Sequence, residues 1–123
     1  MKKILTFFIL FISTSSFAEE YKSNFNIDDF NLAQNEGKIV VVHSWNEFCN
    51  TCLKQKPILE KAKNEFQNII FMNFEQTKSK DIAKFLKIDY WTTIVIYKDN
   101  KELGREIGLY KEKDIYNLIK KGI

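Results

Sequence analysis

Two short, nearly continuous apolar runs stand out in the hydrophobic pattern of the chain. The first begins at Ile39 and extends to Trp45, and the second covers residues 69–74. Apolar runs of this length, without polar alternation, predict strands that are covered on both faces. Between them, residues 53–66 place apolar side chains at helical spacing. The pattern therefore predicts strand, helix and strand at the centre of the fold.

Further helices and a hairpin are predicted on both sides of this centre. The predicted order is helix, helix, strand, strand and helix, over residues 28–36, 79–87, 93–98, 103–107 and 111–121. Gly37 ends the first of these helices and Ser79 caps the second, in which Phe85 is expected to face inward. A turn at residues 99–101 joins the two strands of the hairpin.

This order of elements predicts an α/β fold. Two strands joined through a helix are parallel by the right-handed crossover rule, and the terminal hairpin adds antiparallel strands to the same sheet. We expect three layers, with a mixed central sheet of about four strands and helices on both faces.

The first eighteen residues predict a signal peptide. Lys2 and Lys3 precede an apolar stretch over residues 4–12, and Ser16-Phe17-Ala18 is a small-x-small cleavage signature. Nine apolar residues are too few to span a bilayer, although an uncleaved anchor is the alternative. Cleavage near Ala18 would leave one domain, residues 19–123, in the periplasm or outside the cell.

Composition limits the classes of partner. The 123-residue chain has a formal net charge of +3. Two of these positive charges belong to lysines of the leader, so the predicted domain is close to neutral. Its lysines are interleaved with acidic and apolar residues, as on an ordinary solvated surface. The charge pattern therefore gives no basis for nucleic-acid binding.

The only two cysteines form the motif Cys49-Asn50-Thr51-Cys52, between the first predicted strand and the helix that follows. Two thiols at this spacing can close a disulfide across one turn. Cys49 would lie at a helix N-terminus, where backbone N–H groups and the helix dipole stabilise a thiolate. This setting predicts a thiol–disulfide site in which Cys49 is the attacking sulfur.

Two cysteines at this spacing have three other possible uses. A purely structural disulfide with two intervening residues would reduce the entropy of the unfolded chain only slightly, and so would stabilise the fold little. Zinc needs three or four ligands, and His43 is the only histidine that could join the two sulfurs. Covalent haem attachment requires a histidine directly after Cys52, where Leu53 stands. We therefore expect no cofactor and no metal.

With these elements in place, the chain resembles the thioredoxin family over most of residues 25–122. The resemblance is carried by Trp45 four places before Cys49, Pro57 five places after Cys52, the strand and turn at 94–101, and Gly108. It implies that Cys49 is the nucleophile and that Cys52 is a buried resolving thiol. It also implies protein thiols or disulfides as partners.

The chain departs from the family pattern at three places. His43 stands where thioredoxins have a buried aspartate that moves the proton of the resolving thiol, and an imidazole could do this near neutral pH. Thr92 occupies the position of the family's cis-proline, so the bond before it is either held cis, at a cost of about 2.5–4 kcal/mol, or trans in a reshaped loop. The dipeptide Asn50-Thr51 does not fix the reduction potential.

The sequence thus predicts an exported thiol–disulfide oxidoreductase that is monomeric, with a membrane-bound reductase or oxidase as a candidate partner. Phe48 and Trp91 flank the thiols and predict, with Thr92, a contact surface for protein substrates. The alternative function is a redox-quiet binding or chaperone module on the same fold, favoured by Thr92. A metal-binding module is the third reading.

Overall fold

The structure is a computed structural model that describes residues 21–123. The elements are α1 (Ile27–Asn35), β1 (Ile39–Trp45), α2 (Asn50–Glu65), β2 (Ile69–Glu75), α3 (Lys80–Leu86), β3 (Thr93–Lys98), β4 (Lys101–Ile107), α4 (Glu112–Ile119) and the 3-10 turn Lys120–Gly122. The predicted signal peptide, residues 1–18, lies outside the described residues. Within the described part of the chain, no helix has both the length and the apolar character needed to cross a membrane.

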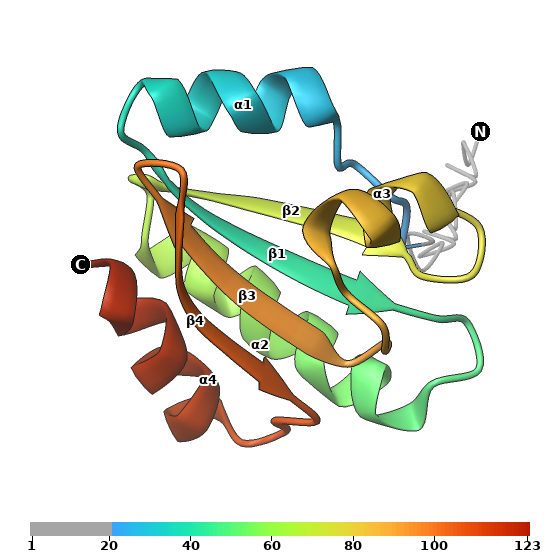
Figure 1. The fold of residues 1–123 in the computed structure, drawn as a ribbon. Coiled ribbons are helices and arrows are strands. Elements are labelled where there is room, and N and C mark those ends of the chain that lie inside the picture. The colour runs from blue at the N-terminus through green and yellow to red at the C-terminus, as the bar shows by residue number, and fades with distance from the viewer. Residues whose placement is uncertain (1–20) are drawn as a thin grey trace, which may run out of the picture.

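The four strands form one mixed sheet in the order β2-β1-β3-β4 (Figure 1). β1 runs parallel to β2, and β3 runs antiparallel to both β1 and β4. This confirms the predicted topology, in which a helix crosses between two parallel strands and a hairpin completes the sheet. In the parallel register, Trp45 at the end of β1 lies opposite Glu75 at the end of β2.

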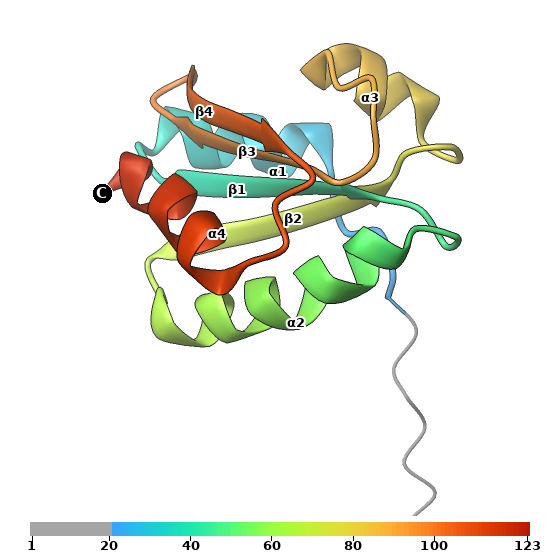
Figure 2. The same cartoon turned by 90° about the horizontal axis from the view of Figure 1, so that it is seen from below.

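Helices cover both faces of the sheet, with α1 and α3 on one side and α2 and α4 on the other (Figure 2). Successive side chains of a strand point in opposite directions, so alternate residues of β1 pack on opposite faces of the sheet. Val40 and Val42 pack into the core under α1 and α3, whereas Val41 packs with Leu59 and Ile115 under α2 and α4. This double burial explains why the strand is apolar without alternation.

Two details of the prediction were wrong. The turn between β3 and β4 has only two residues, Asp99 and Asn100, so β4 begins at Lys101 rather than at 103. Both turn residues have positive φ, 53° and 61°, which Asp and Asn tolerate better than most residues and which a tight hairpin requires. Phe85 is 45% exposed, because Leu86 is the residue that α3 turns into the core there.

The segment before α1 lies along the outer edge of β2. The backbone N–H groups of Asn24 and Phe25 both donate to the carbonyl of Asn73, and the Asn24 side chain accepts from the Asn73 backbone N–H. Phe25 packs into the core beneath α1. This contact directs Tyr21 and Ser23 toward the end of the sheet where the cysteines lie.

Candidate functional site

Cys49 and Cys52 form a disulfide at the first turn of α2. Cys49 is the N-cap of the helix, with extended backbone angles, and its Sγ accepts the backbone N–H of Cys52 at 3.0 Å. The structure thus brings the two predicted sulfurs together where the sequence placed them. In the reduced protein, that N–H and the helix dipole would stabilise a thiolate on Cys49 and lower its pKa.

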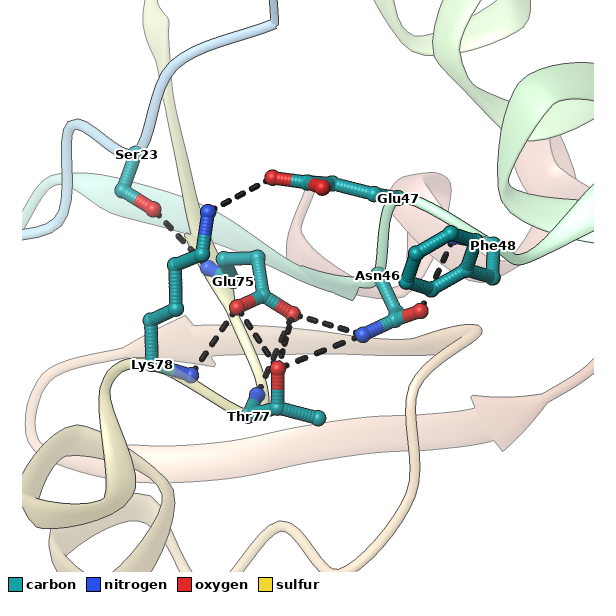
Figure 3. A network of polar contacts seen from close by, with 7 residues as sticks. All are labelled: Ser23, Asn46, Glu47, Phe48, Glu75, Thr77 and Lys78. Atoms are coloured by element: carbon teal, nitrogen blue, oxygen red, sulfur yellow. Dashed lines mark hydrogen bonds and ion pairs between the residues drawn. The ribbon is translucent and has the colours of Figure 1, made fainter.

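The loop that delivers Cys49 is held by the side chain of Asn46. Its Oδ1 accepts the backbone N–H of Phe48 at 2.9 Å, and its backbone carbonyl accepts the N–H of Cys49 at 3.2 Å. Its Nδ2 in turn donates to Glu75 Oε1 at 2.9 Å (Figure 3). The position of the attacking sulfur therefore depends on a contact between the ends of β1 and β2.

Glu75 anchors this contact from inside the protein. Its buried carboxylate also accepts the hydroxyl and the backbone N–H of Thr77 and the backbone N–H of Lys78. Burial acts to raise the pKa of Glu75, but the hydrogen bonds from Thr77, Asn46 and Lys78 outweigh it, so the pKa is lowered. Sequence reasoning missed this residue, and the available signal was an acid at the end of an apolar strand.

A nearby ion pair changes the charge around the thiols. Lys78 Nζ lies 2.6 Å from Glu47 Oε1, and both side chains are largely exposed. Glu47 is two residues before Cys49, where an unpaired carboxylate would oppose the thiolate. Its pairing with Lys78 offsets part of that repulsion, by an amount that screening keeps small at an exposed site.

His43 is fully buried in β1 and hydrogen-bonded at both ring nitrogens. Nδ1 lies 3.1 Å from the Tyr21 hydroxyl, and Nε2 lies 2.8 Å from Oε1 of Gln55. Burial lowers the pKa of His43 to about 4, with a smaller opposing contribution from Gln55. The imidazole is therefore neutral near pH 7, and the proton-moving role assigned to it from the sequence remains a prediction.

Thr92 precedes β3 in a loop whose peptide bonds are trans. Of the two conformations considered from the sequence, the structure therefore has the reshaped trans loop. The φ of Thr92 is 64°, a left-handed conformation that is uncommon for a β-branched residue. Its N–H donates to the Ser44 carbonyl at 2.8 Å, and its carbonyl accepts the Gly108 N–H at 3.1 Å.

Exposed aromatic side chains of the redox loop and of the loops before β3 and before α4 are called the aromatic surface below. Phe48 is 88% exposed and Trp91 is 43% exposed, so both predicted contact residues face the solvent. Leu53, Tyr90 and Tyr110 are exposed as well. Leu53 follows Cys52 in α2, whereas Tyr90 and Tyr110 lie in the loops before β3 and before α4. Trp45, by contrast, is buried, and its indole N–H donates to Asn73 Oδ1 at 2.8 Å.

Cys52 also borders a pocket of about 590 Å³ between α2 and the segment before α1. Its wall also includes Tyr21, Trp45, Lys56 and Lys78, and Lys56 Nζ lies over the Tyr21 ring, 4.9 Å from its centroid. No cluster of three or more histidine, cysteine, aspartate or glutamate side chains in residues 21–123 is arranged to hold a metal ion. The described residues therefore offer no such cluster for the third predicted function, a metal-binding module.

Comparison with known proteins identifies relatives of the chain. The family model described as Thioredoxin matches residues 16–121. A thioredoxin of Coprinus comatus is 32% identical over 85 residues, which cover 68% of this chain and 80% of that protein. The crystal structure of Trxlp from Edwardsiella tarda has a TM-score of 0.74 at 17% identity, covering 80% of this chain and 98% of the other. Fasciola hepatica thioredoxin has a TM-score of 0.70 at 23% identity, covering 78% and 93%.

The contact between Glu75 and Asn46 can be tested by Glu75→Gln. The glutamine amide has the shape of the carboxylate, but its NH₂ group would face N–H and O–H donors that now bond Glu75. We therefore expect the free energy of unfolding to fall by about 1–3 kcal/mol. Glu47→Gln, at an exposed pair, should change it by less than about 1 kcal/mol. Urea unfolding of the oxidised proteins at pH 7 measures both. Equal effects of the two substitutions would contradict the anchoring role of Glu75.

The neutral state of His43 predicts a stability loss in mild acid. Between about pH 6.5 and pH 4 the unfolded chain binds a proton that the folded chain does not, so stability falls as the pH drops. At pH 5 the loss relative to pH 8 should be about 2 kcal/mol. His43→Leu should be less stable overall but should lack this slope in urea unfolding. The same slope in both proteins would show that other groups cause it.

The left-handed conformation of Thr92 predicts opposite outcomes for two substitutions. Thr92→Gly keeps the N–H and adopts positive φ freely, so its stability should stay within about 1 kcal/mol of the wild type. Thr92→Pro loses the bond to Ser44 and cannot adopt φ near 64°, so it should lose about 3 kcal/mol or more. Urea unfolding measures both. A proline variant as stable as the wild type would show that the loop has a second, equally favourable conformation.

Proposed function

Because this chain belongs to the thioredoxin family and is a thiol–disulfide oxidoreductase, we propose that it exchanges disulfides with protein partners outside the cytoplasm through Cys49 and Cys52. The observation that carries the proposal is the disulfide at the first turn of α2, with Cys49 as the N-cap. This arrangement supports a low pKa for the Cys49 thiol, and a thiolate is the form of cysteine that attacks a disulfide.

The exchange has two steps. In the reduced protein, the Cys49 thiolate attacks one sulfur of a partner disulfide, a mixed disulfide forms, and the other partner sulfur leaves as a thiolate. Cys52 then attacks Cys49 Sγ, the intramolecular disulfide closes, and the second partner sulfur is released. Two electrons pass from the pair to the partner. The reverse sequence oxidises a partner dithiol, and the relative reduction potentials decide the direction.

The proposed contact surface for the partner consists of Phe48 and Trp91 on the two sides of the disulfide. Both present aromatic area to solvent, as a surface that binds other proteins does. Thr92, assigned from the sequence to the same surface, is buried, and its backbone N–H and carbonyl are already bonded. Its proposed part is to fix the loop that carries Trp91.

His43 completes the proposed machinery as the group that moves the proton of Cys52. Its ring is neutral near pH 7, but burial lowers its pKa to about 4, so it is a weak base that would hold the proton only transiently. Nδ1 accepts a hydrogen bond from the Tyr21 hydroxyl, and this hydroxyl would have to turn away before the ring took up a proton. We therefore expect His43 to act on the release of the mixed disulfide rather than on its formation.

The proposed location is the periplasm or the cell exterior. It is supported by the positive start, the apolar stretch and the small-x-small signature that ends at Ala18. An oxidising compartment would require a partner that resets the redox state of Cys49 and Cys52, and a membrane-bound reductase or oxidase is the proposed class. We propose that the domain acts as a monomer and does not bind nucleic acid.

A redox-quiet binding module is the second candidate function. Thr92 favours it, because a non-proline residue in a bonded, left-handed loop stands at the position of the family's cis-proline. In that case the disulfide between Cys49 and Cys52 would stay closed while the aromatic surface bound its partner.

Trapping distinguishes the two functions. Cys52→Ala should accumulate a mixed disulfide through Cys49 when mixed with insulin, because the resolving thiol is gone. Cys49→Ala should form at least tenfold less adduct, since Cys52 lies inside α2 and lacks the N-cap position that stabilises a thiolate on Cys49. Non-reducing electrophoresis with mass spectrometry measures the adducts. If neither variant captures insulin and the wild type does not reduce it, the binding module is the correct reading.

A further inference from the structure

Gln55 is a buried polar side chain that the reaction steps above do not use. It lies in α2, three residues beyond Cys52, and its side chain is fully buried. An amide in this environment is costly unless its donors and its acceptor are bonded. Its partners therefore show what this position does.

All three hydrogen bonds of the Gln55 amide have good lengths. Nε2 donates to the carbonyl of Thr92 at 3.1 Å and to the carbonyl of Leu109 at 2.8 Å. Oε1 lies 2.8 Å from Nε2 of His43. One side chain thus joins the helix of the redox pair to β1 and to two separate loops.

The chemistry of these partners determines which atoms carry the protons in the hydrogen bonds from Gln55 to His43 and Tyr21. Backbone carbonyls only accept, so the amide nitrogen must face Thr92 and Leu109, and Oε1 must face His43. His43 therefore carries its proton on Nε2, which leaves Nδ1 to accept from the Tyr21 hydroxyl. Burial raises the pKa of Tyr21, so this hydroxyl keeps its proton.

The two loops that Gln55 joins carry part of the exposed aromatic surface. Trp91 directly precedes Thr92, and Tyr110 directly follows Leu109. The Gly108 N–H also donates to the Thr92 carbonyl, so the loops bond each other as well as Gln55. Strained backbone such as the left-handed Thr92 persists only where the surroundings over-determine it.

We propose that Gln55 is a positioning residue that holds the Thr92 and Leu109 loops against α2 and fixes His43 in its Nε2-protonated form. His43 and Thr92, two of the three departures from the thioredoxin pattern, are then one hydrogen-bonded unit with Gln55 at its centre. The effect on partner binding rests on the proposed function, because it requires that partners use the aromatic surface. The effect on His43 and on the loops does not.

The kinetic test compares Gln55→Leu with Gln34→Leu. Gln34 is a matched control, since it is also buried and its side chain bonds the backbone of Lys38 and Asn100. These bonds join the segment between α1 and β1 to the β3–β4 turn, at the end of the sheet away from the start of α2 (Figure 1). With insulin as substrate and dithiothreitol as electron source, Gln55→Leu should raise KM at least fivefold, because the loops that carry Trp91 and Tyr110 lose their support. It should also lower kcat at least threefold, because His43 loses the bond that fixes its ring. Gln34→Leu should leave both within twofold of the wild type. Equal KM values in the two variants would overturn the positioning role.

A second measurement needs no enzymatic activity, and its first part uses only the wild-type protein. Nitrogen NMR of wild-type His43 should show the neutral ring protonated on Nε2 from pH 6 to 8, and Gln55→Glu should raise the pKa of His43 by placing a carboxylate beside it. A wild-type ring protonated on Nδ1 would contradict the assignment. A wild type that shows the expected ring but does not reduce insulin would instead contradict the proposed function and leave the bonding of Gln55 intact.

Discussion

The position of β1 is the constraint on which the rest of the structure depends. It is paired with β2 on one edge and with β3 on the other, and its side chains fill the cores on both faces of the sheet. Such a strand cannot shift by one residue without moving its apolar side chains to the wrong face. Its carboxyl end is therefore a fixed point from which the redox loop begins.

Two buried polar residues transfer this fixed position to the sulfurs. Glu75 holds the loop before Cys49 through Asn46, and Gln55 holds the loops around the disulfide through Thr92 and Leu109. Both are fully bonded, as buried polar groups must be if they are to specify one geometry rather than destabilise the core. The thiols, which need freedom to exchange partners, thus lie on a rigid support.

The electrostatic setting of the site comes mainly from neutral groups. His43 is kept uncharged by burial, and Cys49 faces backbone N–H groups at the start of α2. The ion pair of Glu47 with Lys78, beside the redox loop, is exposed and largely screened. We therefore expect the reduction potential of the pair to depend more on the geometry of the helix start and the Thr92 loop than on ionic strength.

The sequence by itself determined the strands, the helices and the placement of Cys49 at a helix start, because these depend on residues within about four positions of each other. It also identified His43 and Thr92 as unusual. It did not determine the left-handed trans loop, the neutral histidine or the roles of Glu75 and Gln55. The hydrogen bonds of Gln55 join residues that are 12, 37 and 54 positions apart in the sequence. Such residues become buried neighbours only when the sheet and the helices have packed. Tertiary structure decided these features because a polar side chain in the core must take whichever partners the fold brings within reach.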